Sequence, residues 1–187
     1  MKALLQFFWQ MLRFKRGPED APYSPALLLL VIIANFMITA GAQLIARPAH
    51  THIALVMPLI SITVEIIAVY FFLHLKQLNA RFVQTAISIF FCDTLLTLLA
   101  IPLLVVSLQL GTKSPLLTVF GVFELVLTMW SIMLRGFIYH RAMNIGPFLA
   151  NTLAFMLMII SISITIKIFP DLLAQAKAVA QSSTQSR

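Results

Sequence analysis

Five apolar runs, each long enough to cross a bilayer as a helix, constrain this chain more than any other feature. They cover residues 25–46, 52–75, 81–108, 115–138 and 147–169. A transmembrane helix needs about 20 mostly apolar residues, and every run reaches that length. We therefore predict an all-α fold, a polytopic membrane bundle of about five transmembrane helices.

The composition excludes a water-soluble globular domain. Of the 187 residues, 60% are hydrophobic and 10% are charged, and the mean hydropathy is +0.97. Soluble domains are about 45–50% apolar and about 25% charged. We therefore assign the net charge of +7 to loops that face anionic lipid headgroups, and not to nucleic-acid binding.

The segments outside the five runs are short. Residues 1–14 predict an amphipathic helix that is too short to span and lies in the membrane interface. Residues 15–24 are polar and rich in proline, which predicts an extended linker. Residues 170–187 form a predicted C-terminal tail.

Loop charge predicts the orientation. The segments on the same side of the membrane as the N-terminus hold eight basic residues. The short loops on the opposite side hold two, Arg47 and Lys113. The eight are Lys2, Arg13, Lys15, Arg16, Lys76, Arg81, Arg135 and Arg141. Because cytoplasmic loops are enriched in Lys and Arg, we expect the N-terminus inside and the C-terminus outside.

The run at 115–138 carries a polar seam at helical spacing. Its members are Gly121, Glu124, Thr128, Ser131 and Arg135. They share one face of a helix that is otherwise apolar, so the seam is expected to face protein and not lipid.

Each of the three central runs also carries one acid, Glu65, Asp93 or Glu124. A basic residue near one end of the same helix lies at nearly the same distance from each acid: Lys76 at 11 residues, Arg81 at 12 and Arg135 at 11. If those basic residues form one layer at the membrane boundary, all three acids lie about 16–18 Å from that layer, near the middle of the membrane. An acid at that depth costs about 2.5–3.5 kcal/mol on insertion scales. We therefore expect the acids to face other helices.

Two interpretations of the acids remain open. In one, they converge as a proton or cation site, with Thr97, Thr128 and Asn35 as further oxygen ligands, and share a proton because like charges repel. In the other, each protonated carboxyl fixes helix packing through a hydrogen bond. Arg135 is expected to snorkel to the headgroups or to gate an inward cavity.

No sequence motif points to an enzyme. Metalloprotease, phosphate-loop, nucleophile-elbow and haem-attachment patterns are all lacking, so we expect no catalytic residues and no cofactor. His74 and His140 end two spans on the same predicted side, and a bis-histidine metal or haem site can be drawn from them. Interfacial solvation is the ordinary explanation for both.

Two short stretches resemble known families. The linker RGPEDAPYSPALL, through Arg16, Pro18, Asp20, Pro22 and Ser24, resembles the start of small uncharacterised proteobacterial inner-membrane proteins. The stretch MWSIMLRGFIYHRAM, Met129–Met143, is similar to the last third of bacterial Yip1-like membrane proteins. This resemblance implies a five-span protein of the bacterial inner membrane and brings no catalytic residues with it.

We expect a non-enzymatic scaffold, accessory subunit or Yip1-like module whose polar seam specifies packing or docking. Its partner would be another membrane protein or a second copy of the chain. The alternative is a small proton- or cation-coupled transporter that uses Glu65, Asp93 and Glu124.

Overall fold

The computed structural model of the protein describes residues 2–48, 50–110 and 115–170, which form an all-α bundle without strands. Five of the helices are long and apolar enough to cross a membrane. The helices are α1 Lys2–Leu12, α2 Pro25–Ala46, α3 Thr51–Leu75, α4 Phe82–Gln109, α5 Pro115–Met143 and α6 Pro147–Ile168, with short 3-10 turns at Pro18–Asp20 and Asn79–Arg81.

The helix boundaries follow local sequence signals. Ser24 caps α2, because its hydroxyl accepts a hydrogen bond from the backbone N–H of Leu27 at 3.2 Å, and Pro25 takes the first helical position. Pro147 takes the same position in α6. The predicted tail at 170–187 lies outside the described residues, apart from Pro170.

α5 differs from the predicted span at 115–138, because it continues to Met143. The polar residues after the apolar run suggested a helix end, but none of them breaks a helix. The chain leaves helical geometry at Asn144, whose φ is +53°, just before Pro147. The helix therefore outlasts its apolar run, and Arg135 lies eight residues from the helix end.

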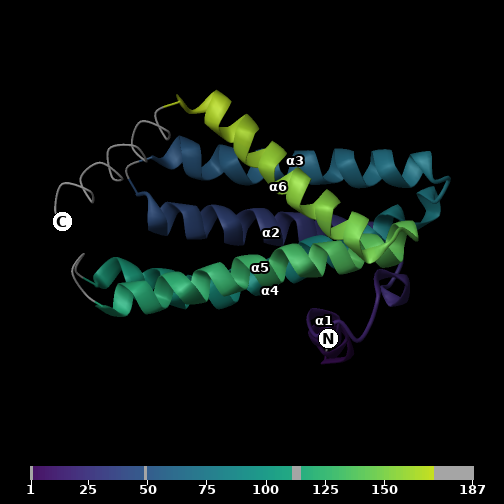
Figure 1. The fold of residues 1–187 in the computed structure, drawn as a ribbon, viewed down its shortest axis with the longest axis horizontal. Coiled ribbons are helices and arrows are strands. Elements are labelled where there is room, and N and C mark those ends of the chain that lie inside the picture. Colours follow the sequence, from purple (N-terminus) through teal and green to yellow (C-terminus); the bar gives the residue numbers. More distant parts are fainter. Residues whose placement is uncertain (1, 49, 111–114, 171–187) are drawn as a thin grey trace.

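In Figure 1, α2, α3, α4 and α5 run roughly side by side and α6 crosses them obliquely. The largest fully buried side chains lie toward one end of the bundle. This is the end where α3 turns into α4 and α5 into α6, and we call it the α3–α4 end. Fully buried side chains there include Leu73, Ile87 and Ile138. Toward the other end, α5 exposes Val122 and Leu125. The α3–α4 half of the bundle is therefore the tightly packed one.

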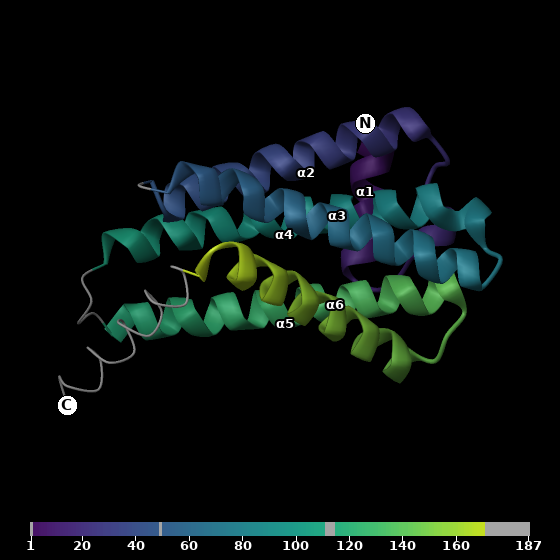
Figure 2. The ribbon, with the colours of Figure 1, turned by 90° about the horizontal axis from the view of Figure 1, so that it is seen from above.

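α1 crosses the bundle roughly at right angles to the spans, as Figure 2 shows. Its apolar face packs on α4 and α5: Phe8 is fully buried and stacks on Phe91, with ring centroids 3.7 Å apart. The indole N–H of Trp130 donates to the backbone carbonyl of Leu12 at 3.1 Å. Trp9 lies on the outer side and is 56% exposed. α1 is thus an amphipathic helix that is docked on the bundle by its apolar face.

A close helix crossing joins α5 to α6. A Cβ atom on Gly136 would collide with the side-chain amide of Asn151 and would lie 3.0 Å from its Cα. We expect Gly136→Ala to destabilise the protein by about 1–3 kcal/mol, because the two backbones must separate. Gly121→Ala, where a Cβ meets open space in the same helix, is the matched control and should be neutral or stabilising. Thermal unfolding in mild detergent measures both, and equal effects would contradict the close crossing.

Candidate functional site

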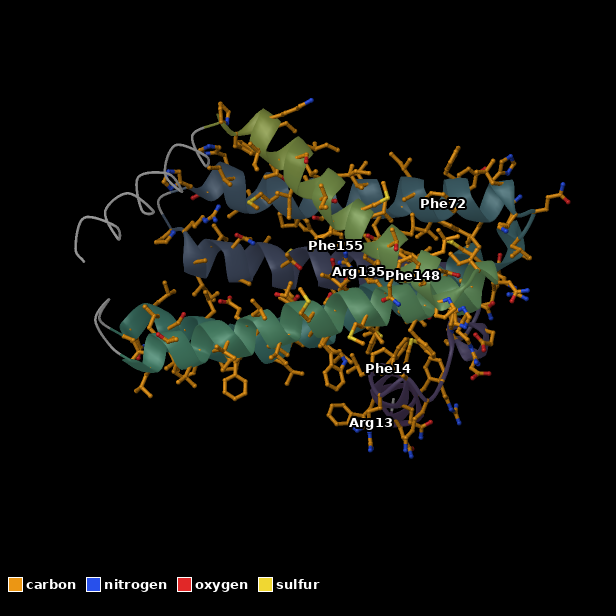
Figure 3. The ribbon with its side chains drawn as sticks, in the orientation of Figure 1. Arg13, Phe14, Phe72, Arg135, Phe148 and Phe155 are labelled. Carbon is orange, nitrogen blue, oxygen red and sulfur yellow. The ribbon has the colours of Figure 1, made fainter. Side chains whose placement is uncertain are left out.

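A cluster of charged side chains joins three of the spans near their packed half. Arg135 on α5 forms two hydrogen bonds with Asp93 on α4, Nη2 to Oδ2 at 2.5 Å and Nε to Oδ1 at 3.3 Å. Its Nη1 lies 3.5 Å from Oε2 of Glu65 on α3. A two-pronged contact of this kind fixes the orientation of both groups as well as their distance. Figure 3 labels Arg135 in the middle of the bundle.

Tyr139 completes the cluster from one helical turn further along α5. Its hydroxyl donates a hydrogen bond to Oε1 of Glu65, and its side chain is fully buried. The two oxygens of Glu65 are therefore held by two residues of α5, Tyr139 and Arg135. The predicted span ends at residue 138, which leaves Tyr139 just outside it. Its i, i+4 spacing from Arg135 was the available signal.

The helix lengths explain why these residues meet. Glu65 lies ten residues before Leu75, the end of α3, and Asp93 lies eleven residues after Phe82, the start of α4. A short turn joins α3 to α4, so both carboxylates lie about 15–17 Å from that end. Arg135 lies about 12 Å from the end of α5 and reaches the same level with its long side chain.

Glu124 lies at a different height, which corrects the prediction of three acids at one depth. It is eleven residues from Arg135, or about 16 Å along α5, toward the other end of the bundle. The prediction took Arg135 as part of the basic layer at the membrane boundary, but Arg135 lies level with Glu65 and Asp93. The snorkelling interpretation expects the Arg135 guanidinium to reach toward the headgroups. In the structure it faces the carboxylates of Glu65 and Asp93 instead.

The cluster forms part of the wall of a polar cavity of about 320 Å³ between the spans. Glu124 and the predicted ligands Thr97, Thr128 and Asn35 also line this cavity. A second cavity of about 400 Å³, on the side of α6, shares five lining residues with the first. The shared residues are Ser61, Glu65, Thr128, Ser131 and Arg135. The predicted site residues therefore face a common space, although they do not all touch one another.

Hydrogen bonds hold some of the lining side chains and leave others available. The amide of Asn35 donates to the Thr94 hydroxyl at 3.2 Å and to the Phe90 carbonyl at 3.3 Å, which ties α2 to α4. The Thr128 hydroxyl donates to the backbone carbonyl of Glu124 at 2.8 Å. Within the described part of the chain, the Glu124 carboxylate forms no salt bridge. It is the carboxylate of this cavity that is open to a ligand.

The charges do not balance within the cavity. In the first cavity, the carboxylates of Glu65, Asp93 and Glu124 stand against the guanidinium of Arg135, a net charge of −2 when all are ionised. Arg47 lines the second cavity and lowers the excess over both cavities to −1. In a site of low dielectric, this excess favours a cation or bound protons and disfavours anions. Hydroxyl and amide oxygens along the walls suit a cation as well.

The described residues contain no group of three His, Cys, Asp or Glu side chains that could hold a metal ion. His74 lies 3.3 Å from the Asn79 amide, and His140 contacts the Ile145 carbonyl. Each histidine that was considered for a bis-histidine site therefore has a local partner at the end of its own helix.

Comparison with family models, with curated proteins and with solved structures gave no match to this chain.

Proposed function

We propose that this protein is not an enzyme and that it carries small cations or protons across the bacterial inner membrane through the polar cavity. One observation carries the proposal: carboxylates from α3, α4 and α5 line a single polar space that has an excess of negative charge. Charged groups inside a membrane are costly, and they mark ion pathways in many transport proteins. Glu65 and Asp93, paired with Arg135, would form the fixed part of the site, and Glu124 the part that takes the cation.

The access route follows from the packing. The buried side chains of Leu73 and Ile138 lie between the cluster and the α3–α4 end, whereas the cavities extend toward the other end. Lys76 and Arg81 favour a cytoplasmic location for the α3–α4 end, with the N-terminus inside and the C-terminus outside. The cavity would then load from outside the cytoplasm.

Labelling of substituted cysteines tests this route. Ser61→Cys and Thr128→Cys place thiols on the cavity wall, whereas Ser88→Cys places one at a fully buried position. The native Cys92 is itself buried and provides the background. In right-side-out vesicles, we expect a membrane-impermeant thiol reagent to label the two cavity variants at least tenfold faster than Ser88→Cys. Labelling only in inside-out vesicles, or no difference from Ser88→Cys, would contradict an outward-facing cavity.

The scaffold or accessory-subunit interpretation, including a Yip1-like module, is the second candidate. It is favoured by the exposure of Glu124 and Thr128 on α5 within an apolar span, because an exposed carboxylate there requires cover. Purification from the native membrane in mild detergent, followed by mass spectrometry, separates the two candidates. A stoichiometric partner supports an accessory subunit, and a homomer with cation flux supports a transporter.

A further inference from the structure

The charges exposed to the second cavity, on the side of α6, are positive. Its charged lining residues are Arg47, Arg135 and Glu65, a net charge of +1 when all are ionised. The side chain of Arg135 is 25% exposed, whereas that of Glu65 is 6% exposed and has both oxygens held by α5. Asp93 and Glu124 line only the first cavity. The two cavities therefore differ in the sign of their charge, although they share a wall.

Arg47 reaches into the protein from the end of α2. Its Nη1 lies 3.9 Å from the sulfur of Met57, which lies six residues, or about 9 Å, into α3 from Thr51. Among the described residues, Arg47 forms no salt bridge. A guanidinium without a carboxylate partner keeps its hydrogen-bond donors available for an anion.

Serine hydroxyls from three helices add further donors to this cavity. They belong to Ser61 on α3, Ser131 on α5 and Ser161 on α6. The hydroxyls of Thr128 and Thr165 donate to backbone carbonyls of their own helices. The three serine hydroxyls form no hydrogen bond within the described part of the chain. Each can therefore donate a hydrogen bond to a ligand in the cavity.

We propose that the second cavity binds a small monovalent anion, with Arg47 as its countercharge and the serine hydroxyls as further donors. A charged side chain inside a span is costly, and a bound anion beside Arg47 lowers that cost. The cation at Glu124 and the anion at Arg47 would then occupy separate positions in one joined space. The anion site does not depend on transport, because it follows from the charge and the donors of the second cavity.

Charged thiol reagents test the sign of each cavity. Met158→Cys places a thiol in the second cavity only, and Ala100→Cys places one in the first only. The labelling rates of an anionic and a cationic methanethiosulfonate are measured on the full chain in membrane vesicles. We expect the ratio of anionic to cationic rate to be at least about tenfold higher at Met158→Cys than at Ala100→Cys.

Variants of Arg47 assign this preference to one charge. In the Met158→Cys background, Arg47→Gln should lower the rate ratio by about tenfold, and Arg47→Lys, which keeps the charge, should retain most of it. Lys167→Gln is the matched control, because Lys167 is an exposed charge in the last turn of α6 that does not line the cavity. Equal losses in Arg47→Gln and Lys167→Gln, or in Arg47→Gln and Arg47→Lys, would overturn the role of Arg47.

Protection by chloride tests binding itself. At constant ionic strength, replacing gluconate by chloride should slow the labelling of Met158→Cys in a saturable way and leave Ala100→Cys unchanged, and Arg47→Gln should abolish this protection. Equal rate ratios at the two thiols, no protection, or protection that survives Arg47→Gln would each overturn the anion site. Protection without cation flux would contradict the transport proposal alone. Thiols that react from neither side of the membrane would contradict both proposals.

Discussion

Arg135→Gln is expected to destabilise the folded protein by about 3–5 kcal/mol, the largest effect of any single substitution in the spans. The change leaves the carboxylates of Glu65 and Asp93 without their countercharge, and their side chains are only 6% and 15% exposed. Removing one partner of a buried ion pair costs more than the pair contributes, because the remaining charge stays desolvated. Denaturant or thermal unfolding in mild detergent, followed by tryptophan fluorescence, measures the loss.

Two further variants show whether charge or packing causes that loss. Arg135→Lys keeps the charge but loses the two-pronged contact with Asp93, so it should have an intermediate effect. The triple variant Arg135→Gln/Glu65→Gln/Asp93→Asn removes all the charges together and should recover most of the stability. A triple variant no more stable than Arg135→Gln would mean that the three residues are not coupled through charge.

Glu124→Gln is expected to leave the fold intact and to lower cation or proton flux by about tenfold or more. The carboxylate is exposed to the cavity and forms no salt bridge with the described residues, so a near-isosteric amide disturbs no packing. It removes one of the three negative charges that would attract the cation. Each tenfold loss corresponds to about 1.4 kcal/mol of interaction with the transported ion. Flux into proteoliposomes measures the effect, with thermal unfolding as the check on folding.

Asp20→Asn is the control for this experiment. Asp20 is an exposed acid of the linker, outside the spans, so the substitution changes the net charge equally without touching the cavity. Its flux should equal that of the wild type. If Glu124→Gln also transports at the wild-type rate, the carboxyl has a structural or docking role, and the accessory-subunit interpretation gains support.

The transmembrane architecture could be predicted from the sequence because the bilayer imposes it. Backbone groups inside a membrane must be hydrogen-bonded within a helix, so an apolar run of sufficient length forms a transmembrane helix. The five spans and the amphipathic α1 follow from this constraint, and Pro25 and Pro147 mark two helix starts. The polar faces of the spans also identified residues that line the cavity, among them Glu65, Asp93 and Glu124.

The pairing within the site was decided by tertiary structure alone. Helical spacing tells which residues share a face of one helix, but it does not tell how far each helix extends past its apolar run. α5 continues to Met143, which brings Arg135 level with Asp93 and Glu65 and carries Tyr139 into contact with Glu65. The relative heights and rotations of helices depend on side-chain packing between them. The sequence alone therefore identified the charged residues of the spans, and helix packing selected the partners of each.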